Sequence, residues 1–126
     1  MRRRVLVVDD EEPVRYVLQD ALGELYEVAI GDSGAAALAR LDDFRPDVVL
    51  LDYNMPRMTG LEVLRAIKAR DPSIEVIMVT GTSDAQIAAT AVELGVFAFL
   101  PKPFVVSRVV ELVGAALAHR APKAAC

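Results

Sequence analysis

Cysteine, histidine and tryptophan are nearly absent from this sequence of 126 residues, which has one cysteine, one histidine and no tryptophan. Cys126 has no second cysteine in the chain, so an internal disulfide is excluded. Zinc sites are usually built from clusters of cysteine and histidine, and the sequence contains no such cluster. A metal site in this chain would therefore have to use oxygen ligands such as carboxylates.

Long apolar runs and an excess of basic residues are absent as well. No apolar run approaches the ~18 residues that a membrane-spanning helix needs. The run that follows the arginines at 2–4 covers only residues 5–8 and then turns acidic, which excludes a signal peptide. The net charge of −4 gives no basic surface for nucleic acid. We therefore expect a cytoplasmic protein that binds neither a membrane nor nucleic acid directly.

What the sequence does contain is enough apolar material for one core. Hydrophobic residues make up 54% of the chain, and 126 residues is the size of one domain. Strand-like and helix-like patterns alternate five times, which predicts a parallel sheet with crossover helices. The expected strands are 5–8, 26–30, 48–51, 76–79 and 97–100, and the expected helices are 13–22, 33–41, 61–69, 84–94 and 105–119. We expect one domain over 1–120 and a disordered tail over 121–126, which has no such pattern.

Four of the apolar runs end on polar residues that a phosphoryl-transfer site needs. These residues are Asp9 and Asp10 after the first strand, Asp52 after the third, Thr80 after the fourth and Lys102 after the fifth. Sites in an open parallel sheet form outside the carboxyl ends of the strands. Three carboxylates, a hydroxyl and an ammonium are therefore expected to share one edge.

Asp52 is the expected nucleophile of this site. A carboxylate attacks phosphorus only if the negative charges are offset, and a divalent cation held by Asp9 and Asp10 would offset them. Mg²⁺ suits this role because it accepts a few carboxylates together with water and phosphate oxygens. Lys102 would pair with the phosphoryl oxygens as a point charge, and Thr80 would donate its hydroxyl. Each residue alone also has an ordinary structural interpretation, such as a turn cap or a surface lysine, so the prediction depends on the whole set.

Four segments of the sequence together resemble the receiver domain of bacterial two-component response regulators. They are VVDDE at 7–11, LLDYNMP at 50–56 with MTG at 58–60, VTG at 79–81 and FLPKPF at 99–104. They occur in the family's order, and the resemblance covers residues 4–119. It implies a flavodoxin-like (βα)5 doubly wound parallel sheet of strand order 2-1-3-4-5. Right-handed crossovers would then put the first and fifth helices on one face and the other three on the opposite face.

The resemblance also implies a role for each matching residue. Asp52 would accept the phosphoryl group, and Lys102 would bind it. Mg²⁺ would be held directly by Asp10 and Asp52, through water by Asp9, and by the main-chain carbonyl of Asn54. Thr80 and Phe99 would form the switch that responds to phosphorylation.

The partners implied by the resemblance lie on both sides of this reaction. The phosphoryl donor would be a phosphohistidine on a sensor histidine kinase or a phosphotransfer domain. The domain would then be a phosphorylated switch with slow hydrolysis, not a turnover enzyme. Its output surface would combine 84–94, 97–100 and 105–119, with a homodimer through that surface as an alternative. No pattern of an output domain follows residue 119, so we expect either a separate output partner or a longer regulator of which this chain is a piece.

Two departures from the family pattern affect the switch region. Gly81 stands where alanine is more usual, which is expected to loosen the loop after Thr80. Residues 96–98 are apolar where the family often has small or acidic residues, which is expected to make the output surface more apolar. Period-two alternation further predicts that Phe97 and Phe99 lie on the same face of the sheet.

Three alternative functions are less compatible with the sequence. A metal-dependent phosphatase with an aspartyl-phosphate intermediate would carry its nucleophile after the first strand, with an acidic residue two positions later. Here the expected nucleophile, Asp52, follows the third strand, and the residue two positions later is Asn54, which cannot act as an acid. A flavin-binding protein of this fold would need a phosphate loop at 9–12, where the sequence is acidic. A receiver used only for interaction would be expected to lack some of the acidic or switch residues, and none is missing.

Overall fold

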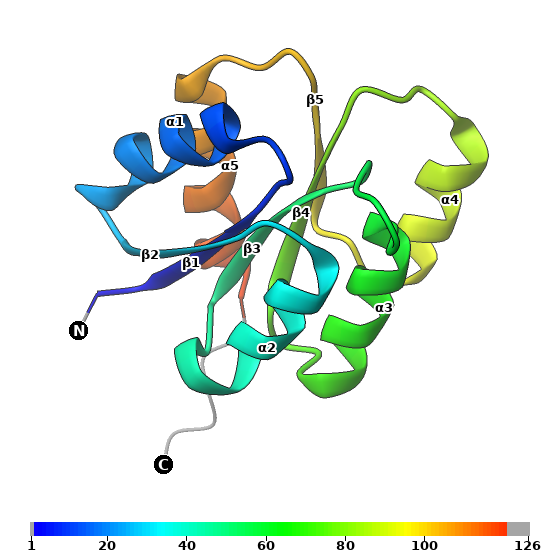
Figure 1. Ribbon diagram of the computed structural model, residues 1–126, viewed down its shortest axis with the longest axis horizontal. Coiled ribbons are helices and arrows are strands. Elements are labelled where there is room, and N and C mark those ends of the chain that lie inside the picture. The colour runs from blue at the N-terminus through cyan, green and yellow to red at the C-terminus, as the bar shows by residue number, and fades with distance from the viewer. Residues whose placement is uncertain (1, 121–126) are drawn as a thin grey trace.

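The computed structural model describes residues 2–120 and contains one five-stranded sheet covered by helices on both faces (Figure 1). All neighbouring strands are parallel and their order is β2-β1-β3-β4-β5, which confirms the predicted fold. The elements in chain order are β1 (Arg4–Val8), α1 (Glu12–Gly23), β2 (Glu27–Gly31), α2 (Gly34–Phe44), β3 (Val48–Asp52), α3 (Gly60–Arg70), β4 (Glu75–Thr80), α4 (Ala85–Glu93), β5 (Ala98–Pro101) and α5 (Val106–His119). The expected tail at 121–126 lies outside the described residues, so the domain boundary stays a prediction. None of the described helices combines the length and the apolar character that a membrane crossing requires.

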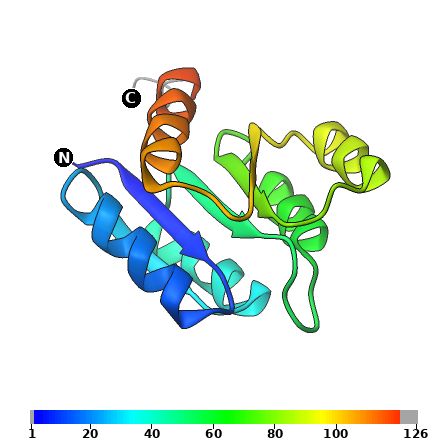
Figure 2. The same ribbon diagram turned by 90° about the horizontal axis from the view of Figure 1, so that it is seen from above.

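The helices form two layers, as the right-handed crossovers predict. Figures 1 and 2 show α1 and α5 on one face and α2, α3 and α4 on the other. Alternate residues of one strand enter different cores: Val5 and Val7 pack toward α1 and α5, whereas Leu6 and Val8 pack toward α2 and α3. Because the central strands are buried on both faces, their sequences are continuous apolar runs and show no alternation.

The second helix is longer than expected, ending at Phe44 instead of residue 41. Ser33 caps its start by accepting a hydrogen bond from the amide of Ala36. Phe44 is buried, and the guanidinium groups of Arg4 and Arg40 lie against its ring. Phe44 follows Leu41 at helical spacing, so it extends the buried face of the helix by three residues beyond the predicted end.

The fifth strand differs from the prediction in the placement of its two phenylalanines. The strand begins at Ala98, so Phe97 precedes it and does not follow its alternation. Phe97 packs toward α5, with its ring 5.2 Å from that of His119, whereas Phe99 packs on the opposite face. The prediction that the two rings share a face is therefore wrong. Residues 96–98 are also half-buried, so they add less apolar surface than expected.

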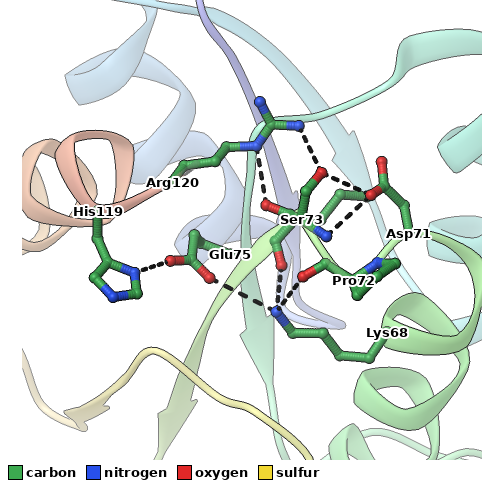
Figure 3. Close-up of polar contacts among 8 residues, drawn as sticks. Lys68, Asp71, Pro72, Ser73, Glu75, His119 and Arg120 are labelled. Atoms are coloured by element: carbon green, nitrogen blue, oxygen red, sulfur yellow. Dashed lines mark hydrogen bonds and ion pairs between the residues drawn. The ribbon is translucent and has the colours of Figure 1, made fainter. Parts of the chain in front are cut away.

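The amino-terminal edge of the sheet carries a network of paired charges (Figure 3). Glu75, the first residue of β4, is buried and contacts two side chains from opposite helical layers. His119 of α5 bonds one of its carboxylate oxygens, and the ammonium of Lys68 on α3 lies 3.6 Å from the other. Arg120 donates to the carbonyl of Ser73 and pairs with Asp47 at 3.0 Å. The charges at this edge are thus neutralised within the fold.

Candidate functional site

The opposite, carboxyl edge of the sheet brings the predicted site residues together. Asp9 and Asp10 follow β1, Asp52 ends β3, Thr80 ends β4 and Lys102 follows β5. One carboxylate oxygen from each aspartate lies within 4.8 Å of the other two. Asp9 and Asp52 are each only 2% exposed, whereas Asp10 is open to solvent. The three carboxylates therefore form an acidic cluster that solvent reaches at Asp10.

Lys102 is the one cation that touches these carboxylates in the described part of the chain. Its ammonium lies 3.2 Å from Asp9 Oδ2, 3.4 Å from Asp52 Oδ1 and 3.5 Å from Glu11 Oε1. Burial acts to lower the pKa of Lys102, but the charges of Asp52 and Asp9 outweigh it and raise this pKa. Lys102 is therefore charged throughout the neutral range and sits beside the predicted nucleophile.

One lysine does not neutralise the three carboxylates of the acidic cluster. Burial, together with the charge of Asp9, raises the pKa of Asp52 from its usual 3.8 to about 6, although Lys102 and the amide of Asn54 act in the opposite direction. Buried carboxylates that repel one another are a setting in which a divalent cation is favoured. The all-oxygen donor set at this edge fits Mg²⁺, which binds through a few carboxylates and keeps several waters.

The loop after β3 contacts the acidic cluster at Asp52. The amide of Asn54 donates to Asp52 Oδ1 at 3.3 Å, so this loop contacts the predicted nucleophile directly. The metal-binding role of the Asn54 carbonyl stays a prediction. Gly60 closes the loop through a hydrogen bond to the Tyr53 carbonyl. A Cβ at Gly60 would lie 2.8 Å from the Tyr53 Cα and 3.0 Å from the Asp52 carbonyl oxygen, so only glycine fits there.

Thr80 and Phe99 both line a cavity next to the site. The Thr80 hydroxyl is nearly buried and accepts a hydrogen bond from the amide of Thr82 at 3.0 Å. The cavity has a volume of about 210 Å³ and is lined on its far side by Ile87 and Ala88 of α4. Phe99 is half-buried at its wall. Space for a change of side-chain packing thus exists between the site and α4.

Two residues at this edge were not identified from the sequence. The carboxylate of Glu11 is exposed to solvent, and it also lies 3.5 Å from the ammonium of Lys102. Arg15 of α1 donates through its guanidinium to the Asp9 carbonyl at 2.8 Å. Arg15 follows the acidic pair by five residues, which places it one turn into the helix that starts there. This spacing is the only sequence signal that could have indicated its position.

The comparisons with known proteins agree with this site and fold. A family model described as the response regulator receiver domain matches residues 5–114. The chain therefore belongs to the family of response regulator receiver domains.

Its relatives include both larger regulators and proteins of similar size. The chain is 42% identical over 116 residues to the DNA-binding transcriptional regulator NtrC of Escherichia coli (strain K12), covering 91% of this chain and 25% of that protein. It is 36% identical over 110 residues to the chemotaxis protein CheY of Listeria monocytogenes, covering 86% of this chain and 92% of that protein. The chain thus spans about a quarter of the length of the NtrC relatives that it matches.

Solved structures agree at the level of the whole domain. A CheY-like receiver domain protein from Methanospirillum hungatei JF-1 superposes with a TM-score of 0.92 at 26% identity, covering 95% of this chain and 97% of that one. The receiver domain of NtrX from Brucella abortus superposes with a TM-score of 0.85 at 32% identity, covering 91% and 98%.

Proposed function

We propose that this receiver domain accepts a phosphoryl group on Asp52 from a phosphohistidine of a sensor histidine kinase or phosphotransfer domain. The observation that carries the proposal is the contact of Asp52 with Lys102 within the acidic cluster that Asp52 forms with Asp9 and Asp10. In the transfer, an Asp52 carboxylate oxygen forms a bond to phosphorus. The bond between phosphorus and the histidine nitrogen breaks, and its electron pair leaves with that nitrogen.

The acidic cluster and Lys102 would each offset part of the charge in this reaction. Asp10 and Asp52 would hold Mg²⁺ directly, with the carbonyl of Asn54 and a water on Asp9 completing the protein's share of the ligands. The cation would offset charge between the carboxylates and the phosphoryl oxygens. Lys102 is already within 3.4 Å of Asp52 and would move its ion pair to a phosphoryl oxygen. Thr80 would exchange its bond with the Thr82 amide for donation to the phosphoryl group.

The product is a switch, because hydrolysis of the aspartyl phosphate by water is expected to be slow. Inward movement of Thr80 would enlarge the cavity that Phe99 borders, and the phenyl ring would become more buried. Phenylalanine has no hydroxyl, so its inward position leaves no polar group unsatisfied. The surface of α4, β5 and α5 would then present a changed shape to an output partner, and a homodimer through that surface is an alternative. We place this function in the cytoplasm, without direct contact with nucleic acid.

Intact-mass measurement tests the acceptor. The protein is incubated with Mg²⁺ and a small phosphodonor, and we expect the mass of one phosphoryl group that is stable in acid and lost in base. Asp52→Asn should gain none at this site, whereas the exposed control Asp20→Asn should label like the wild type. Unchanged labelling of Asp52→Asn would show that the acceptor is a different residue.

Magnetic resonance tests the switch independently. Amide and aromatic shifts are compared with and without beryllofluoride, which mimics the phosphoryl group at Asp52. We expect changes around Asp52 and also through residues 81–104. Changes confined to the surroundings of Asp52 would refute the coupling through Thr80 and Phe99.

A further inference from the structure

The loop that carries Asp9 and Asp10 is held at three points around Asp9. The Asp9 amide donates to the Gly31 carbonyl at the end of β2 at 3.1 Å. Asp9 Oδ1 accepts from the amide of Glu11 at 2.9 Å, and the Asp9 carbonyl accepts from the guanidinium of Arg15 at 2.8 Å. The contact with Gly31 joins two backbone groups, and the contact with Glu11 uses the carboxylate of Asp9 itself. The third depends on a side chain one turn into α1, and it is the one that a substitution can remove without changing the loop itself.

Arg15 differs from Lys102 in what it touches. Lys102 contacts carboxylate oxygens directly, so it competes with a cation for the same atoms. Arg15 forms no ion pair within residues 2–120, and its bond goes to a main-chain oxygen. It therefore brings positive charge and a hydrogen bond to the acidic loop without itself occupying a carboxylate oxygen.

The loop needs such support because repulsion between its carboxylates opposes the conformation that brings them together. The carboxylates of Asp9, Asp10 and Asp52 converge to within 4.8 Å of one another although like charges repel. Arg15 is half-buried and borders a hollow beside Gly31 and Asp32, and its guanidinium bonds the Asp9 carbonyl in the loop after β1. A rotation of the Asp9 peptide would break this bond and turn the two aspartates apart.

We propose that Arg15 is a positioning residue for divalent cation binding, acting through the Asp9 carbonyl to keep the carboxylates of Asp9 and Asp10 convergent. This inference rests on the proposed function, because it concerns the affinity for Mg²⁺. Partners that orient metal ligands without touching the metal commonly change metal affinity by about 10–100-fold when removed. Arg15→Gln is expected to weaken Mg²⁺ binding about tenfold.

Two readouts separate this role from general stability. Titration with Mg²⁺, followed by amide shifts, gives the dissociation constant. Hydrogen exchange of the Glu11 amide reports the position of the Asp9 carboxylate, because that carboxylate is its acceptor. In Arg15→Gln we expect weaker cation binding together with faster exchange at Glu11. Arg65→Gln is the matched control, since Arg65 is an exposed arginine on α3, and it should leave both readouts at wild-type values.

Arg15→Lys separates the hydrogen bond from the charge. Positioning is supported if the Mg²⁺ affinity and the protection of the Glu11 amide change in parallel, both falling in Arg15→Gln and both falling or both recovering in Arg15→Lys. Full affinity in the Lys variant, a loss in the Gln variant and unchanged Glu11 protection in both would overturn positioning in favour of charge alone. Wild-type affinity in Arg15→Gln would overturn the inference outright. A wild-type protein that binds no Mg²⁺ would refute the proposed function, and the inference with it.

Discussion

Replacing Asp52 by asparagine is expected to stabilise the metal-free protein at neutral pH, although it removes the proposed phosphoacceptor. The folded protein holds the Asp52 carboxylate in a nearly buried position beside Asp9, and burial and this neighbour raise its pKa from 3.8 to about 6. Each pKa unit corresponds to about 1.4 kcal/mol, so ionised Asp52 disfavours folding by on the order of 3 kcal/mol above pH 7. Asparagine keeps the shape and the acceptor for the Asn54 amide but carries no charge.

The pH dependence follows from the direction of this change. Because the folded state binds the Asp52 proton more tightly than the unfolded state does, wild-type stability from this group falls as the pH rises from 4 to 6. Asp52→Asn lacks this titration. The advantage of the variant should therefore be about 3 kcal/mol at pH 7.5 and about half of that at pH 5.

Urea unfolding in the presence of a chelator measures this difference at both pH values. The exposed control Asp20→Asn should change stability by less than about 0.5 kcal/mol at either pH. Addition of Mg²⁺ should stabilise the wild type and reduce the advantage of Asp52→Asn, because the cation offsets the charge that asparagine lacks. If Asp52→Asn is no more stable than the wild type at pH 7.5 without cation, the charge of Asp52 is already neutralised in the folded protein, and the reasoning is wrong.

Three further changes test other parts of the structure. Millimolar Mg²⁺ should raise the melting temperature of the wild type, and Asp10→Ala should lose most of that rise; an equal rise in the variant would remove Asp10 from the ligand set. Arg57→Gly should stabilise the protein by about 0.5 kcal/mol in urea unfolding, because Arg57 has a φ of 73° that favours glycine. The control Arg65→Gly, within α3, should lower the free energy of unfolding by about 1 kcal/mol. A loss of stability at both positions would contradict this reasoning. Glu75→Ala should lower the free energy of unfolding by about 2–3 kcal/mol, since it leaves Lys68 without its buried carboxylate, and a change below about 0.5 kcal/mol would show that the network at this edge is not stabilising.

The fold could be predicted because its signals are local. The strands of the sheet centre are unbroken apolar runs, and each ends on a polar residue at the same point relative to the sheet. Parallel pairing then brings Asp9, Asp52 and Lys102 to one edge without further information. Those residues are the ones that the structure places within ion-pair distance of one another.

The features that could not be predicted are contacts between distant residues or details of where an element begins. Alternation predicts the wrong face for Phe97 because it applies only within the strand, whose register with β4 begins at Ala98. The ion pair of Glu75 with Lys68 joins β4 to a side chain of α3. The bond from Arg15 to the Asp9 carbonyl involves a main-chain acceptor, which no residue pattern encodes.

The two edges of the sheet differ in how completely their buried charges are neutralised, and this difference links stability to function. At the amino edge, buried Glu75 meets both Lys68 and His119, and buried Arg120 meets Asp47. At the carboxyl edge, buried Asp9 and Asp52 share a single lysine. At the first edge the buried charges are paired within the fold and do not require a ligand. At the second edge the pairing is incomplete, so we expect a bound cation to stabilise the fold there, and Lys102 would be placed to pair with a phosphoryl group on Asp52.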